Sequence, residues 1–147
     1  IDKGAYNKLY GKKECNDGLK EISNKSKIKI ISSGYMTHKS LEIVKELKEA
    51  GLLIDVIDLY KLKPLNESAI IDIIEKSDFI FTIEENTYIG GIGSMICEVI
   101  ADNNLNVKLK RLALNDEQVL DFGDRDWLIE KSGLGREKII NSLKGAL

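Results

Sequence analysis

The stretch of this sequence with the clearest chemical character is a glycine cluster that follows two adjacent glutamates. Its polar and glycine positions are Glu84, Glu85, Gly90, Gly91, Gly93 and Ser94. Backbone N–H groups at the start of a helix bind anions, so the cluster is a candidate anion site. Its spacing matches neither G-x-G-x-x-G nor G-x-x-x-x-G-K-[ST], the common nucleotide-binding motifs. The weak motif favours a tight loop whose glycines let a helix pack closely on a sheet, and the anion site is the alternative.

The two glutamates stand side by side at the end of a predicted strand. Successive side chains of a strand point to opposite faces of the sheet, so Glu84 and Glu85 are not expected to face each other. A carboxylate pair that performs acid–base catalysis needs facing side chains with separated pKa values. We therefore predict a structural role for both glutamates rather than a catalytic one.

Other residue types that commonly perform catalysis or bind metals are scarce. The chain has one histidine, His38, and two cysteines, Cys15 and Cys97. This set falls short of the usual metal ligands and proton shuttles, and it forms no nucleophile–base pair that can be recognised in the sequence. We predict no metal site and no catalytic residue in this chain. Two cysteines make no disulfide framework, which favours a reducing compartment, the cytoplasm.

The composition is that of a globular protein. The chain has 147 residues, of which 43% are hydrophobic and 31% charged, enough for one domain with a buried core. Its net charge of -2 makes nucleic acid a poor partner. No apolar run approaches the ~20 residues of a membrane span, so we predict no membrane segment.

Short apolar runs alternate with helical patterns from Ile28 onward. Strands are predicted at residues 28–31, 52–59, 78–84 and 107–114, and helices around 41–50, 70–74, 96–100, 126–131 and 136–147. Asn66 is the predicted N-cap of the second helix. Such alternation is typical of a mostly parallel sheet with helices on both faces. We therefore predict an α/β fold, a three-layer αβα sandwich with five or nearly five strands, over residues 28–147. Residues 1–27 are interpreted as a linker or arm.

Several motifs, taken in order, resemble the C-terminal domain of transketolase-like, thiamine-diphosphate enzymes. The matching segments are Ser33–Met36, Val56–Leu59, Leu62–Asn66, Ile83–Asn86, Gly90–Ser94, Asp116, Gly123 and Ser132–Leu134. The resemblance covers roughly residues 28–147. Within the family, the E-E-N segment is most similar to 1-deoxy-D-xylulose-5-phosphate synthases and to split, two-subunit transketolases. The E1 beta subunits of 2-oxoacid dehydrogenases share the domain but match this segment less well.

The resemblance implies a domain of an enzyme that transfers ketol or aldehyde units. In such an enzyme, thiamine diphosphate and Mg²⁺ are bound by a diphosphate-binding and a pyrimidine-binding domain, on the same chain or on a partner subunit. The C-terminal domain would then provide homodimer contacts and domain packing, bind no cofactor itself, and be inactive alone. Lys3 stands where the family usually has a basic residue that contacts the phosphate of a sugar phosphate substrate.

Two alternatives remain open at the level of the sequence. The first is a free-standing regulatory module that binds an anion or another ligand at the Gly90–Gly93 loop. The second is the C-terminal part of a 2-oxoacid dehydrogenase E1 beta subunit, which would have a lipoyl domain as its partner.

Overall fold

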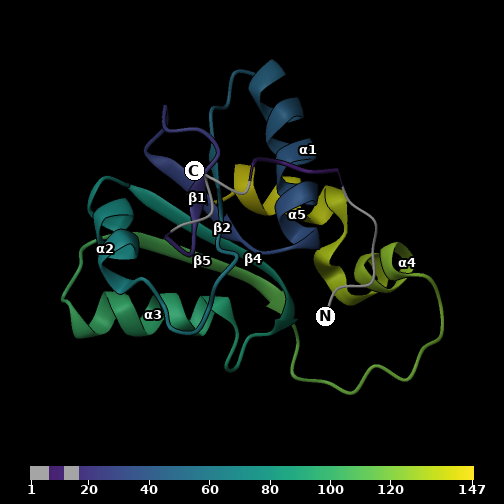
Figure 1. Cartoon of the computed structure of the whole chain (residues 1–147). Helices are drawn as coiled ribbons and strands as arrows, with labels where there is room; N and C mark the ends of the chain where they lie inside the picture. The colour runs from purple at the N-terminus through teal and green to yellow at the C-terminus, as the bar shows by residue number, and fades with distance from the viewer. Residues whose placement is uncertain (1–6, 12–16) are drawn as a thin grey trace.

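A central five-stranded sheet organises the computed structural model, which describes residues 7–11 and 17–147 (Figure 1). The strands are β1 (Lys20–Glu21), β2 (Ile28–Ser32), β3 (Asp55–Asp58), β4 (Phe79–Thr87) and β5 (Lys108–Leu114). Their order across the sheet is β1-β3-β2-β4-β5. β1 pairs antiparallel with β3, and the other pairs are parallel. The predicted sheet, mostly parallel and five-stranded, is confirmed.

Helices cover both faces of this sheet. They are α1 (Tyr35–Glu49), α2 (Glu67–Glu75), α3 (Ile92–Asp102), α4 (Arg125–Ile129) and α5 (Arg136–Lys144), with a π turn over Glu130–Leu134. α2 and α3 lie on one face, and α1 and α5 lie on the other (Figure 1). This arrangement confirms the predicted three-layer αβα fold.

The buried strands supply both cores because their side chains alternate between the faces. In β2, Ile30 packs with α1 and α5, whereas Ile31 packs with α2 and α3. In β4, Phe81 and Ile80 divide between the two cores in the same way. Strands that are apolar at nearly every position are typical of a parallel sheet covered on both sides.

The sequence did not predict β1, whose two residues are polar and only half-buried. The segment around it is held to the sheet by Asp55, which is fully buried at the start of β3. Its carboxylate accepts hydrogen bonds from the backbone N–H groups of Lys25 and Ser26 at 2.7 and 2.6 Å, and from the Ser23 hydroxyl at 2.5 Å. The buried Lys29 ammonium lies 3.7 Å from the same carboxylate. Part of the predicted arm therefore contacts the domain directly.

Capping residues explain where two of the helices begin. The Asn66 side chain accepts a hydrogen bond from the Ala69 N–H at 3.3 Å, which confirms the predicted N-cap of α2. Asp124 caps α4 in the same way, through the Trp127 N–H at 2.9 Å. The π turn that follows α4 includes Gly133 at a φ of 86°, a conformation that glycine adopts readily. These local signals set the helix starts near the carboxyl ends of the strands.

Candidate functional site

A crevice of about 570 Å³ opens at the carboxyl ends of β2 and β4. The chain runs from β2 to β3 on one side and returns to β4 on the other, so this is the point where the strand order reverses. In open α/β sheets, ligands bind at such switch points. The crevice is formed by the loops that follow β2, β3 and β4, together with Arg125 of α4. The crevice is therefore the candidate ligand site of this fold.

Glu84 closes one side of the crevice by binding the start of α3. Its side chain is 4% exposed, and its two carboxylate oxygens accept hydrogen bonds from the N–H groups of Ile92 and Gly93 at 2.6 and 2.8 Å. A carboxylate is favoured at a helix N-terminus because the unpaired N–H groups carry partial positive charge. Glu84 therefore supplies from within the chain the anion that the alternative hypothesis assigns to an external ligand.

The glycines next to Glu84 are needed for close approach. A Cβ at Gly91 would overlap the Glu84 carboxylate, and a Cβ at Gly93 would lie 2.8 Å from the Thr82 hydroxyl oxygen. Gly90 differs, since it adopts a φ of 75° and has open space around it. Ser94 closes the loop by accepting a hydrogen bond from the Gly90 N–H at 3.1 Å. These contacts support the interpretation of the cluster as a tight loop.

Glu85 points to a different group of residues from Glu84. Its carboxylate accepts two hydrogen bonds from the Arg125 guanidinium, one of them 2.8 Å long, from Nε. The guanidinium also lies over the Tyr35 ring, 4.3 Å from its centroid. The two adjacent glutamates thus bind two different helices, α3 and α4, and do not form a carboxylate pair.

A charged cluster continues from Arg125 along α4. The Tyr35 hydroxyl donates to the Asp126 carboxylate, and the Lys39 ammonium lies 3.2 Å from the same group. Hydrogen bonds from Tyr35 and Lys39 lower the pKa of Asp126, and the bond from Tyr35 has the larger effect. Burial and the hydrogen bond to Asp126 raise the pKa of Tyr35. The hydrogen bond between Lys39 and the Tyr35 hydroxyl also raises the pKa of Lys39, so Asp126 and Lys39 stay charged and Tyr35 stays neutral around neutral pH.

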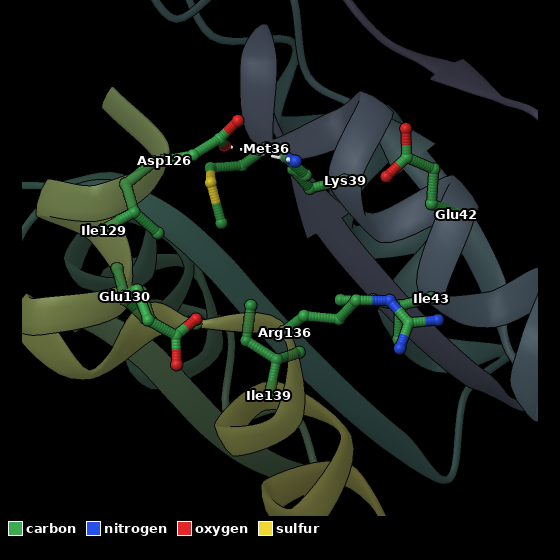
Figure 2. A pocket seen from close by; sticks show the side chains of 11 residues that line it. Met36, Lys39, Glu42, Ile43, Asp126, Ile129, Glu130, Arg136 and Ile139 are labelled. Carbon is green, nitrogen blue, oxygen red and sulfur yellow. Dashed lines mark ion pairs between the residues drawn. The ribbon is translucent and has the colours of Figure 1, made fainter. Parts of the chain in front are cut away.

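A second cavity, of about 290 Å³, lies between α1 and the helices at the carboxyl end of the chain (Figure 2). Its apolar wall includes Met36, Ile43 and Ile139. The Lys39–Asp126 ion pair stands at one side of the cavity, drawn as a dashed line in Figure 2. Arg136, which also lines the cavity, forms an ion pair with Glu46 of α1.

The predicted site residues are distributed unevenly. The crevice brings together Glu84, Glu85, Gly90 and Gly91, while Gly93 and Ser94 lie behind it in α3. Lys3 and Cys15 lie outside the described residues, and His38 lies half-buried in α1. Within residues 7–11 and 17–147, no three His, Cys, Asp or Glu side chains cluster as metal ligands would. No helix of that part is long and apolar enough to cross a membrane.

Sequence reasoning missed Arg125, Tyr35 and Asp126. Tyr35 lies in the Ser33–Met36 motif, but that motif does not reveal its partners, and no motif contains Arg125 or Asp126. Their contacts depend on α4 returning to the carboxyl edge of the sheet after a long loop. The one available signal was Asp124, a capping residue that places the next residues at a helix start. The resulting contacts join α4 to β4 and to α1.

Comparison with known proteins gives a family match for most of the chain. The model of the transketolase C-terminal domain matches residues 18–139. A 1-deoxy-D-xylulose-5-phosphate synthase of Natranaerobius thermophilus is 35% identical over 86% of this chain and 20% of that protein. A synthase of the same name from Clostridium tetani is 31% identical over 91% of this chain and 23% of that protein. The chain therefore spans about a fifth of the length of these relatives.

A similar solved structure is described as "Split gene transketolase, inactive beta4 tetramer". It superposes with a TM-score of 0.82 at 25% sequence identity, over 96% of this chain and 46% of the solved chain. The agreement over almost the whole chain extends the sequence match to the full αβα fold.

Proposed function

Because the chain belongs to the transketolase C-terminal domain family, we propose that it is the C-terminal domain of a thiamine-diphosphate-dependent transferase. The parent enzyme would be a 1-deoxy-D-xylulose-5-phosphate synthase or a transketolase, acting in the cytoplasm on sugar phosphates. The observation that carries the proposal is the family match over residues 18–139, supported by relatives that are synthases of this kind.

We place the cofactor site outside this domain. The structure offers a direct reason, since the Glu84 carboxylate already holds the two N–H groups at the start of α3. A diphosphate at this position would lie against a buried carboxylate of the same charge. The start of α3 therefore does not fit the diphosphate of thiamine diphosphate, and we assign the cofactor chemistry of the parent enzyme to its diphosphate- and pyrimidine-binding domains.

The role proposed for the domain itself is packing and assembly. At the crevice, Glu84 binds α3 and Glu85 binds α4, and we assign to this edge of the sheet the packing of another domain. The family's split members support homo-oligomeric assembly, since one of them is described as a tetramer of its beta chain. Lys3 would add one point-charge contact to a substrate phosphate in the complete enzyme.

Two measurements test this proposal. Calorimetric titration of the isolated chain with thiamine diphosphate and Mg²⁺ is expected to show no binding. Replacing the C-terminal domain of the Natranaerobius synthase by this chain is expected to restore formation of 1-deoxy-D-xylulose 5-phosphate, relative to the same synthase truncated before that domain. Tight cofactor binding by the isolated chain, or a chimera no more active than the truncated synthase, would contradict it.

A further inference from the structure

The cavity between α1 and the helices at the carboxyl end of the chain has apolar walls and a charged rim (Figure 2). Met36 and Ile43 of α1 form one wall, and Ile129, Leu134 and Ile139 form the other. Its volume of about 290 Å³ is close to the lower end of the range for sites that bind small organic molecules. Among the residues that the structure describes, none lines both this cavity and the crevice, so the cavity is a separate candidate site.

The two cationic side chains that line the cavity already have partners within the chain. The Lys39 ammonium lies 3.2 Å from the Asp126 carboxylate, and this is the pair drawn in Figure 2. The Arg136 guanidinium forms an ion pair with Glu46 of α1. Since each cation is already neutralised by a carboxylate, the rim is not suited to an anionic ligand.

Two further carboxylates line the cavity, those of Glu42 and Glu130. Over residues 7–11 and 17–147, no side chain or backbone group forms a hydrogen bond or an ion pair with either of them. Glu42 belongs to α1 and Glu130 to the π turn, and Figure 2 shows them on opposite sides of the cavity. The charge that the chain leaves unpaired at this rim is therefore negative.

Gly135 allows the Glu130 carboxylate to lie at the edge of the cavity. A Cβ at Gly135 would overlap the carboxylate oxygens of Glu130, so a larger residue would displace them. The requirement is for space rather than for a positive φ, since Gly135 has a φ of -63°. Figure 2 shows the Glu130 side chain directed from the π turn toward Ile139 of α5. An unpaired carboxylate thus lies next to an apolar wall, which is the arrangement that an amphipathic cation requires.

We propose that this cavity binds a small organic cation, a primary ammonium group on an apolar body. The ammonium pairs with the Glu130 carboxylate, and the Glu42 carboxylate adds to the negative potential at the rim. The apolar body packs against Met36, Ile43 and Ile139. Hydrogen bonds between an ammonium and a carboxylate are stronger than those between neutral groups, so the charge decides which ligand binds. The proposal concerns a site separate from the crevice and does not depend on the function proposed above.

The first test compares three probes that share a phenyl body: 2-phenylethylamine, 2-phenylethanol and 3-phenylpropanoate. The whole chain, labelled with ¹³C at its methionine methyl groups, is titrated with each probe, and the Met36 signal is followed. We expect a Kd below about 1 mM for the amine, binding at least about tenfold weaker for the alcohol, and none for the carboxylate. The internal control is Met95, which lines the crevice and whose signal should not move.

Substitutions then identify the carboxylate that binds the ammonium. Glu130→Gln is expected to weaken binding of the amine at least about fivefold, and Glu42→Gln about twofold, with binding of the alcohol unchanged in both. Glu137→Gln is the matched control, because Glu137 is exposed in the first turn of α5 and does not line the cavity. Glu42 and Glu130 are exposed, so their variants should keep the thermal melt of the parent.

Nuclear Overhauser contacts between the phenyl protons of the amine and the methyl groups of Ile43 and Ile139 would place the bound probe in the cavity. Three results would each overturn the proposal: an amine that does not bind up to about 10 mM, an alcohol that binds as tightly as the amine, or an amine affinity that Glu130→Gln lowers no more than Glu137→Gln does. Contacts of the bound amine with Met95 instead of these isoleucines would also overturn it.

Discussion

At the scale of single residues, Glu84 has the contacts most closely tied to the family motif. Its side chain is buried, and its two carboxylate oxygens accept hydrogen bonds from two backbone N–H groups at the start of a helix. These hydrogen bonds explain in structural terms why the first position of the E-E-N motif is a glutamate. The second, Glu85, binds Arg125 in the opposite direction, as the alternation of a strand requires.

Replacing Glu84 by alanine is expected to lower the free energy of unfolding by about 2–4 kcal/mol, because two buried N–H groups lose their acceptors. Glu84→Gln should cost less, since its carbonyl oxygen still accepts one hydrogen bond. Urea unfolding followed by circular dichroism measures both changes. Equal stability of Glu84→Ala and the parent would show that water replaces the carboxylate without loss.

Gly91 provides a second check on the same contact. Gly91→Val is expected to lower stability by about 1–3 kcal/mol. The structure gives the cause as overlap with the Glu84 carboxylate rather than a positive φ, since Gly91 has a φ of -87°. In a Glu84→Ala background the valine should therefore cost less than in the parent. If the effects of the two substitutions on stability are additive in this double-mutant cycle, Gly91 and Glu84 do not interact and the predicted overlap is wrong.

Asp55 leads to a prediction about pH. Burial by itself raises the pKa of its carboxyl, but hydrogen bonds from Ser23, Ser26 and Lys25 outweigh burial and lower it. The carboxylate therefore stabilises the fold above its unfolded pKa of about 3.9, and this contribution is lost as the pH falls through the lower, folded value. Asp55→Asn is expected to cost about 2–4 kcal/mol at pH 7, because Lys29 stays buried beside it.

The measurement is the unfolding free energy of the parent and of Asp55→Asn between pH 2 and 7. We expect the difference between the two proteins to shrink below about pH 4, where the unfolded carboxyl is protonated. Asp78→Asn is the matched control, because Asp78 is 72% exposed in its contact with Lys27. A difference that does not change with pH would contradict the role assigned to the Asp55 carboxylate.

At the scale of elements, α4 is attached differently from the other helices. It has no buried residue, and its main contacts are polar, from Arg125 to Glu85 and from Asp126 to Tyr35 and Lys39. Elements with few buried apolar contacts open at low free energy. The helix and the loop before it are therefore expected to open more readily than the sheet.

Arg125→Ala is expected to speed hydrogen exchange of the amides in residues 115–129 at least tenfold, since the guanidinium joins α4 to both β4 and α1. Global stability should fall by less than about 1 kcal/mol, because the ion pair is only partly buried. Lys76→Ala removes an exposed ion pair at the C-terminal end of α2 and should leave this region unchanged. Unaltered exchange in Arg125→Ala would show that other contacts hold α4.

At the scale of the whole molecule, the edge of the sheet at β1 joins the first part of the chain to the domain. Tyr10 donates a hydrogen bond to the buried Asp58, and β1 pairs with β3. Lys29 is 1% exposed and takes its partners from this region, Glu21 at 3.2 Å and Asn24 at 3.1 Å. A buried charge requires such partners to remain in a folded core.

Shortening the chain tests how much of this region the fold needs. A chain that begins at Ile28 is expected to be less stable than one that begins at Asp17 by about 3–5 kcal/mol, since Lys29 then loses Glu21 and Asn24. Thermal and urea unfolding of the two shortened chains would measure this. Equal stability would support a domain that starts at Ile28, as the sequence pattern indicates.

The sequence by itself determined the layered fold, because the information for it is local. The apolar runs around Ile30 and Phe81 are nearly continuous, which identifies strands buried on both faces, and Asn66 marks a helix start. The order of these elements and the E-E-N and glycine motifs were enough to recognise the family.

Only the tertiary structure decided what the candidate site contains. The N–H groups at the start of α3 could bind an external anion only if the Glu84 carboxylate pointed elsewhere. The packing of β4 against α3 sets the direction of that carboxylate. Arg125 reaches Glu85 across 40 residues of sequence, and β1 pairs through two polar residues without any periodicity. Contacts between distant segments leave no local pattern in the sequence, because side-chain partners are set by the packing of elements rather than by neighbours along the chain.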